Sequence, residues 1–203
     1  MNGRPTAGVI AINTAMLWLA TIVASAALWP IYSTSAFLVL VGVSLVLGSV
    51  VAILGARFRW PGFVVALATL GTFVVVGVPV AVPSKAQFVV LPTFEGLADL
   101  FAGVALGWKQ LITITLPVGS YEALLVPALV LVLTTVVLGL SVALRAPFGE
   151  LGVIPPSALF IVDTALGPTF PERPIVLPIA LLGVVLFWLV WFRWYRRRMA
   201  LRR

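Results

Sequence analysis

Long apolar runs recur along this chain, and short polar stretches separate them. Six of these runs are long enough to cross a hydrocarbon layer roughly 30 Å thick as α-helices. They predict transmembrane helices over residues 8–29, 34–56, 60–82, 121–144, 149–167 and 175–194. The pattern therefore predicts an all-α fold, a polytopic membrane helix bundle that forms a single integral membrane domain over residues 1–203.

The first run, 8–29, has to be distinguished from the apolar core of a secretory signal peptide. It is longer than such a core, and it ends in the sequence Trp29-Pro30-Ile31-Tyr32, which is typical of a membrane interface. We therefore interpret this run as an uncleaved span.

The fifth run is the weakest, because Pro155-Pro156 lies inside it. Prolines break a helix interior but suit a helix start. A helix over 155–167 is only about 20 Å long, so a re-entrant hairpin is an alternative to a crossing. Because a hairpin would carry the arginines after residue 194 to the outer side, we expect a full crossing with a kinked or partly unwound inner half.

The longest connection between runs, 83–120, is apolar for a loop. Thr93 is a suitable N-cap, and Glu95 in the first turn favours the positive end of the helix dipole. Apolar side chains then recur at helical spacing: Phe94, Leu97, Phe101, Val104 or Ala105, and Trp108. We predict an amphipathic helix over 93–109, on the outer membrane face or over the bundle mouth. Three glycines are expected to weaken it as a free helix: Gly96, Gly103 and Gly107.

Small residues recur in the second run. Ser44, Gly48 and Ala52 fall four residues apart, on one face of a helix. This spacing is typical of helices that approach each other closely in membranes. We interpret the three residues as a packing surface.

Composition agrees with a membrane location. Of the 203 residues, 62% are hydrophobic and only 9% are charged, and the mean hydropathy is +1.20. Soluble domains carry about 25% charged residues, and a chain of this length cannot hide so much apolar surface in one aqueous core. The composition also excludes an intrinsically disordered chain, which needs low hydrophobicity and high charge.

The distribution of basic residues predicts the orientation. With six spans and an inner N-terminus, ten of the 13 Lys and Arg residues lie on the cytoplasmic side and three lie outside. We expect a multi-pass plasma-membrane protein with both termini cytoplasmic. Its C-terminal arginines are expected to meet anionic lipid headgroups of the bilayer rather than nucleic acid. They are Arg193, Arg196, Arg197, Arg198, Arg202 and Arg203.

Several kinds of catalytic site are excluded by missing residue types. The chain has no Cys and no His, which removes thiol nucleophiles, Cys/His zinc sites and His-based acid–base catalysis. Nucleotide-binding loop motifs are also absent from the sequence. We expect no catalytic set, no cofactor and no metal.

Asp163 is the one acidic residue placed well within a predicted span. An intramembrane carboxylate is costly unless it is paired or protonated, and it is therefore a candidate functional group. Thr164 and Arg173 are its candidate partners in an intramembrane polar site. A structural position near the outer interface, four residues before Gly167-Pro168, is the alternative.

Several short motifs carry a resemblance to a known family. They are Leu91-Pro92-Thr93, Leu97-Ala98-Asp99-Leu100, Gly107-Trp108-Lys109, Leu116-Pro117, Ser141-Val142-Ala143-Leu144-Arg145-Ala146-Pro147, and the helix from Pro155-Pro156 to Gly167-Pro168. Over about residues 15–195, the chain resembles the N-terminal membrane region of bacterial TgpA-type transglutaminase-like proteins, which are common in actinobacteria.

In that family, the membrane region precedes an extracytoplasmic domain with a catalytic Cys–His–Asp set. This chain has no Cys and no His, so no catalytic residue carries over. It is either part of a longer protein or a stand-alone version without the enzyme. The resemblance implies a non-catalytic membrane anchor or scaffold, with other membrane or envelope proteins as partners.

The alternative function is a small transporter, or a permease subunit that works with a separate energising partner. Transporters usually line their path with several polar or charged side chains. In this sequence, Asp163 and scattered Ser and Thr residues are the available groups.

Overall fold

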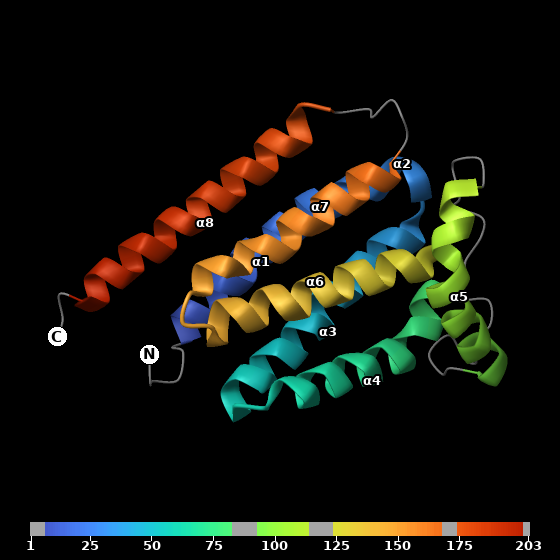
Figure 1. Cartoon of the computed structure of the whole chain (residues 1–203), viewed down its shortest axis with the longest axis horizontal. Helices are drawn as coiled ribbons and strands as arrows, with labels where there is room; N and C mark the ends of the chain where they lie inside the picture. Colours follow the sequence, from blue (N-terminus) through green and yellow to red (C-terminus); the bar gives the residue numbers. More distant parts are fainter. Residues whose placement is uncertain (1–6, 83–92, 114–123, 168–173, 201–203) are drawn as a thin grey trace.

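The computed structural model describes residues 7–82, 93–113, 124–167 and 174–200. Over these residues the chain is helical and contains no strand, as the sequence predicts (Figure 1). The elements are α1 (Ala7–Ser25), η1 (Ala26–Leu28), α2 (Trp29–Tyr32), α3 (Ser35–Phe58), α4 (Gly62–Ala81), α5 (Phe94–Thr113), α6 (Leu125–Arg145), η4 (Gly149–Val153), α7 (Ile154–Leu166) and α8 (Val176–Ala200).

Six helical segments are long and apolar enough to cross a membrane. They are Ala7–Tyr32, Ser35–Phe58, Gly62–Ala81, Leu125–Arg145, Gly149–Leu166 and Val176–Tyr195. Each corresponds to one of the predicted runs, so the predicted multi-pass bundle is confirmed. The first segment ends at Tyr32 rather than at residue 29, because Pro30 lies in the first turn of α2, where a proline costs no backbone hydrogen bond.

The fifth span is built as the prolines predict. Pro155 and Pro156 lie in the first turn of α7, and the 3₁₀ helix η4 precedes them. A 3₁₀ helix rises about 2.0 Å per residue against about 1.5 Å for an α-helix, so the 18 residues of Gly149–Leu166 extend over roughly 30 Å. The inner half is therefore a more tightly wound 3₁₀ helix rather than an unwound segment, and its larger rise gives a short sequence the length of a full crossing.

Helix α6 is the centre of the bundle. It packs against α1, α3, α4, α5, α7 and η4, and its most extensive contact is with α3 (Figure 1). Val132, Val136 and Leu140 of α6 are fully buried. The predicted small-residue surface of α3 lies in the core, because Ser44, Gly48 and Ala52 are all buried. Their role in helix packing is confirmed.

Helix α8 lies at the edge of the bundle (Figure 1). It packs on α1 and η4. Large apolar side chains such as Leu182, Leu186 and Val190 are more than half exposed along it. Trp188 is different, because it is fully buried. Such exposed apolar side chains are expected of a helix that faces lipid.

Helix α5 stands across one end of the other helices and packs on α4 and α6 (Figure 1). It confirms the predicted helix and extends it to Thr113. The predicted cap is also present, since the Gly96 N–H donates to Thr93 Oγ1 over 3.1 Å.

The face of α5 that packs on the bundle corrects the sequence analysis in part. Leu97 and Val104 of the predicted stripe pack on the core, but Phe94 is 94% exposed, and the closest part of the face is Leu100 with Gly96, Gly103 and Gly107, all buried. A Cβ on Gly96 would lie 2.5 Å from Val78 Cγ1, and one on Gly107 would lie 2.9 Å from Pro127 Cγ. The glycines therefore weaken α5 as a free helix but permit its close approach to α4 and α6.

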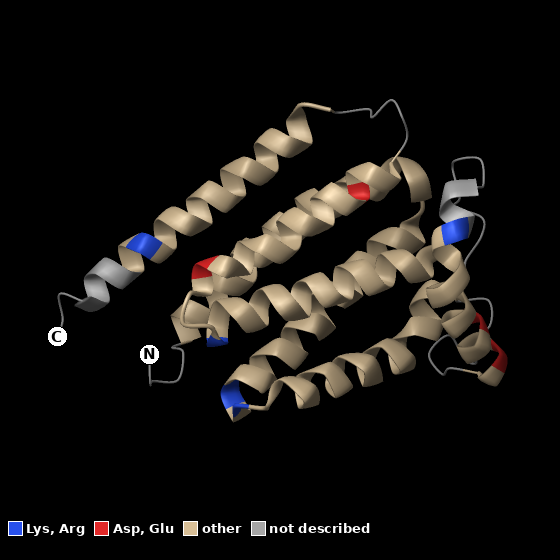
Figure 2. Ribbon diagram, in the orientation of Figure 1, with Lys and Arg blue, Asp and Glu red and all other residues tan. Residues whose placement is uncertain are grey.

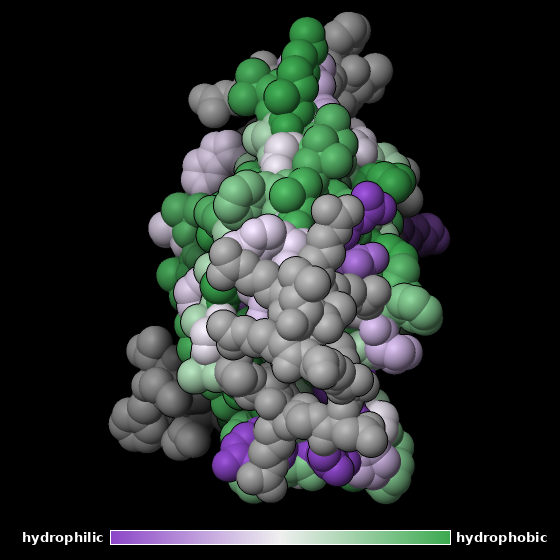
Figure 3. All heavy atoms as spheres, turned by 90° about the vertical axis from the view of Figure 1, so that its left-hand side faces the viewer, coloured by the Kyte–Doolittle hydropathy of each residue, from purple (hydrophilic) through white to green (hydrophobic). Residues whose placement is uncertain are grey.

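The charged residues divide between the two ends of the bundle (Figure 2). Lys109, Glu95 and Asp99 lie on α5. We call the opposite end the arginine end; α1 begins and α8 ends there. It carries Arg57, Arg59, Arg145 and Arg193, together with Glu150 of η4. Figure 3 looks onto the arginine end and shows hydrophilic side chains beside hydrophobic flanks. The arrangement agrees with the ends predicted from the charge rule, and the membrane side that each end faces stays a prediction.

The contact between α3 and α6 yields the first test. A Cβ on Gly48 would lie 2.9 Å from Val136 Cγ1 and 3.1 Å from Val136 Cβ, and a β-branched side chain cannot easily turn away. We expect Gly48→Ala to lower the free energy of unfolding by about 1–3 kcal/mol through overpacking. The measurement is the apparent Tm in detergent.

Gly42→Ala is the matched control on the same helix, because a Cβ on Gly42 meets nothing within 4 Å. That variant should be neutral or slightly stabilising, since alanine favours a helix more than glycine does. Equal Tm values for the two variants would contradict the assigned packing.

Candidate functional site

Asp163 is buried in the bundle rather than exposed at its rim. It lies near the C-terminal end of α7, and its exposed fraction is 0%. Helix α7 packs there against α1, α6 and η1. Neither carboxyl oxygen has a hydrogen-bond partner among the described residues. A buried carboxyl group without a partner is costly to fold, so Asp163 is the strongest candidate functional group in the described part of the chain.

The structure describes one of the two expected partners of Asp163 and not the other. Thr164 is exposed, and its hydroxyl donates to the carbonyls of Phe160 and Ile161, each over 2.9 Å. The Thr164 hydroxyl therefore donates its hydrogen bond to its own helix rather than to the carboxyl group of Asp163. Arg173 lies outside the described residues, and its ion pair with Asp163 stays a prediction.

The predicted headgroup arginines are placed only in part. Arg193 is exposed near the C-terminal end of α8, at the arginine end. Arg196, Arg197 and Arg198 belong to the last turns of the same helix. Arg202 and Arg203 lie outside the described residues.

Three polar groups at the same end of the first span accompany Asp163. Thr21 and Ser25 are one helical turn apart and buried, and neither hydroxyl has a hydrogen-bond partner in the described structure. Tyr32 is buried, stacks on Phe37 at 5.1 Å between ring centroids, and donates its phenolic O–H to the Leu124 carbonyl over 3.0 Å.

Helix α7, which carries Asp163, packs on α1 and on η1 of the first span. A single buried carboxyl group can bind and release a proton. No group of three or more acidic side chains converges within the described ranges. Proton exchange at one carboxyl group is therefore the chemistry that this arrangement offers.

A second polar arrangement links α1 to α8. The Trp188 Nε1–H donates to Asn13 Oδ1 over 2.9 Å, and Asn13 Nδ2 donates to the Val9 carbonyl over 2.8 Å. Both side chains are fully buried. The sequence analysis missed this pair, although an amide in the middle of an apolar run is a signal for an interhelical hydrogen bond.

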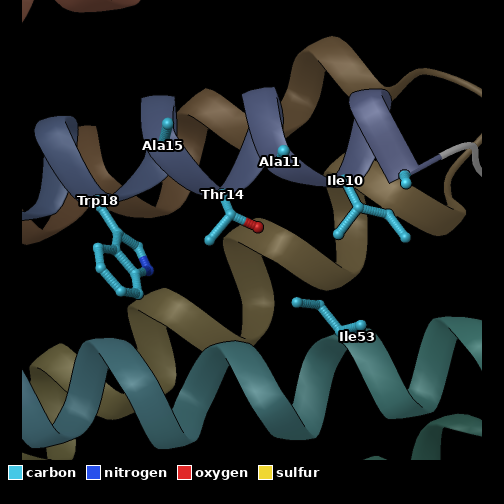
Figure 4. Close-up of a pocket in the computed structure, with 7 residues that line it drawn as sticks. Ile10, Ala11, Thr14, Ala15, Trp18 and Ile53 are labelled. Atoms are coloured by element: carbon cyan, nitrogen blue, oxygen red, sulfur yellow. The ribbon is translucent and has the colours of Figure 1, made fainter.

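A third polar contact joins α1 to α3. The Trp18 Nε1–H donates to Ser49 Oγ over 2.9 Å. Beside it, an open groove of about 460 Å³ lies between α1 and Ile53 of α3. Figure 4 shows Ile10, Thr14 and Trp18 pointing from α1 toward α3, with Ile53 opposite them. This groove is apolar along its described walls, apart from the Thr14 hydroxyl, so it offers contacts to a hydrocarbon rather than to a charged ligand.

No family model, no curated protein and no solved structure matches this chain. The resemblance to the TgpA-type membrane region therefore stays a prediction from short motifs. In the structure, Gly107-Trp108-Lys109 belongs to α5, and Pro155-Pro156 opens α7.

The burial of Asp163 yields a second test. An ionised carboxyl group without a partner opposes folding by several kcal/mol, and asparagine of the same shape carries no charge. We therefore expect Asp163→Asn to raise the apparent Tm in detergent. Glu95→Gln, on an exposed residue of α5, is the control and should change the free energy of unfolding by no more than about 0.5 kcal/mol. If Asp163→Asn instead lowered the free energy of unfolding by about 3–5 kcal/mol, the result would reveal a buried ion pair.

The link between α1 and α8 yields a third test, a double-mutant cycle with Asn13→Leu and Trp188→Phe. Interhelical hydrogen bonds in membranes contribute about 0.6–1.7 kcal/mol, and we expect a coupling energy in this range from unfolding measurements. Asn13→Leu with Trp191→Phe is the matched control, because Trp191 is on the same helix but stacks on Tyr195 at 5.4 Å. Equal coupling in both cycles would rule out a specific bond.

Proposed function

We propose that this chain is a non-catalytic integral membrane anchor or scaffold, which holds an extracytoplasmic transglutaminase-like domain at the plasma membrane. The observation that supports the proposal is α5. This helix is held across the bundle end by its small-residue face, while Phe94, Phe101 and Leu106 remain 94%, 51% and 55% exposed. Exposed apolar side chains gathered on one helix are typical of a surface that a lipid or a partner covers.

The orientation expected from the charge rule supports an outward-facing α5. With the arginine end in the cytoplasm, α5 faces the compartment in which the enzyme domain of the resembling family lies. A rigid bundle suits an anchor, since its helices are joined through small-residue packing and through the Asn13–Trp188 and Trp18–Ser49 bonds. Such a bundle gives α5 a fixed position from which to hold a partner.

The test of this proposal is co-purification. The transglutaminase-like domain of a TgpA-type protein is exported in the same cells as this chain, and the tagged chain is purified in mild detergent. We expect the domain to co-purify, and we expect Phe94→Ser with Leu106→Ser to reduce its recovery about tenfold, because a few exposed side chains contribute most of the binding energy of an interface.

Leu186→Ser on α8 is the matched control, because Leu186 is also about half exposed, at 52%, but lies on another helix. The amount of domain that co-purifies with this variant should equal the amount that co-purifies with the unchanged chain. Equal recovery of the domain from cells that lack the chain would refute the anchor function.

The second candidate function is a small transporter or a permease subunit with a separate energising partner. One observation favours it, the buried carboxyl group of Asp163, which has no hydrogen-bond partner among the described residues. Such a group is typical of proton-coupled transport. Proton flux into proteoliposomes decides between the two functions. An anchor leaves the flux at the level of protein-free liposomes, whereas a flux that Asp163→Asn abolishes would replace the anchor by the transporter.

A further inference from the structure

A second groove runs along the flank of the bundle between α4 and α6, and α5 closes one end of it. Its volume is about 540 Å³, within the range of about 300–1,000 Å³ typical of ligand pockets. The side chains along it recur at helical spacing on one face of each helix. They include Val65, Ala66, Thr69, Leu70 and Phe73 of α4 and Val130, Leu133, Thr134, Val137 and Leu138 of α6.

The walls of this groove are mostly apolar. Near Arg145, Ser141 of α6 also lines it, and the Ser141 hydroxyl has no hydrogen-bond partner in the described structure. Thr69 and Thr134 line it, but their hydroxyls donate to carbonyls of their own helices, Thr69 to Val65 over 2.7 Å and Thr134 to Val130 over 2.6 Å. They therefore present methyl groups to the groove. Leu70 and Leu138 on opposite walls are 51% and 57% exposed, so apolar surface is left for an occupant to cover.

The length of the groove is that of one bilayer leaflet or somewhat more. It extends from Gly62 to Phe73 on α4, roughly 16 Å of helix, and from Val130 to Arg145 on α6, roughly 22 Å. Half of a hydrocarbon core roughly 30 Å thick is about 15 Å. An occupant that fills the groove therefore has the length of a single lipid acyl chain.

The two ends of the groove differ in charge. Phe101 and Val104 of α5 close one end, and Arg145 lines the other. Arg145 is exposed, and its guanidinium donates to the carbonyl of Trp60, which holds it at the groove mouth. A guanidinium carries five N–H donors, so one backbone acceptor leaves donors for an anion.

Two further arginines lie close in sequence to Trp60, the residue that Arg145 contacts. Arg57 and Arg59 are exposed in and directly after the last turn of α3, next to Trp60. Tryptophan is typical of the headgroup level of a membrane, so the mouth lies where a lipid phosphate lies. The charge of the groove is thus complementary to a molecule with an apolar chain and an anionic head.

We propose that this groove binds an anionic phospholipid, with one acyl chain between α4 and α6 and its phosphate on Arg145. The pairing of a planar guanidinium with a phosphate is strong and directional. The groove between α1 and α3 serves as an internal comparison, because no charged side chain lines its described walls. That groove can take a hydrocarbon chain but does not select a headgroup.

The test uses the purified full chain, delipidated in a neutral detergent and titrated with one lipid at a time in native mass spectrometry. Phosphatidylglycerol and phosphatidylcholine with identical acyl chains are compared. We expect phosphatidylglycerol to bind more tightly, because the choline cation of phosphatidylcholine opposes the attraction of its phosphate to the arginines. We expect Arg145→Gln to weaken the binding of phosphatidylglycerol about fivefold and to weaken the binding of phosphatidylcholine less. Arg193→Gln, at the same end but on α8, should retain the affinity of the unchanged chain.

A second pair of variants tests the groove itself and remains informative if Arg145→Gln fails to fold. Leu138→Trp fills this groove and should abolish the tight binding of phosphatidylglycerol, whereas Ile53→Trp fills the groove between α1 and α3 and should preserve it.

Three results would overturn the proposal. They are equal affinity for the two lipids, equal weakening by Arg145→Gln and Arg193→Gln, and a dimer that Leu138→Trp abolishes. The last result would assign the groove to a second copy of the chain. None of these measurements depends on a transglutaminase-like partner, so the anchor function and the lipid site succeed or fail separately.

Discussion

The close approach of helices to α6 is the constraint on which the rest of this structure depends. Without water in the apolar layer, helices gain no hydrophobic driving force from each other and associate through packing and hydrogen bonds. Gly48 lets α3 approach Val136, and a Cβ on Gly139 of α6 would lie 2.6 Å from Leu17 Cδ1 of α1. Larger residues at these positions would separate the helices. The other helices pack on α1, α3 and α6. The positions of the polar groups and of the grooves therefore depend on the contacts among these three helices.

Some buried polar side chains of this bundle have hydrogen-bond partners and others have none among the described residues. Asn13 and Trp188 satisfy each other and hold α8, which otherwise presents mainly exposed apolar side chains. Asp163 is as deeply buried as Asn13, but neither of its carboxyl oxygens has a hydrogen-bond partner in the described structure. Evolution tolerates such a costly group where it has a function or a partner. Asn13 and Trp188 are therefore best explained by helix packing, whereas Asp163 is the candidate functional group.

The features that could be predicted from the sequence are those that depend on one segment alone. Span positions follow from the length of apolar runs, and the start of α7 follows from the chemistry of Pro155-Pro156. The packed face of α5 could not be derived this way, because the shapes of Val78 and Pro127 determine that glycines face the bundle. Nor could the bond between Asn13 and Trp188, since the two residues are 175 positions apart. The burial of Asp163 likewise depends on helices that are distant in sequence.

Helix α4 shows how a lipid can complete the packing of such a bundle. Only 28% of its most apolar window is buried, against 67% for α6, and the groove lies along the face that the two helices share. A molecule that binds the folded state but not the unfolded state stabilises the fold according to its concentration and affinity. An acyl chain in the groove adds contacts to both helices, and a phosphate on Arg145 lies beside the α3–α4 turn that Arg145 already contacts through Trp60. The lipid would therefore act as a packing element between α4 and α6, and anionic lipid would strengthen the contact that holds the α3–α4 turn against α6.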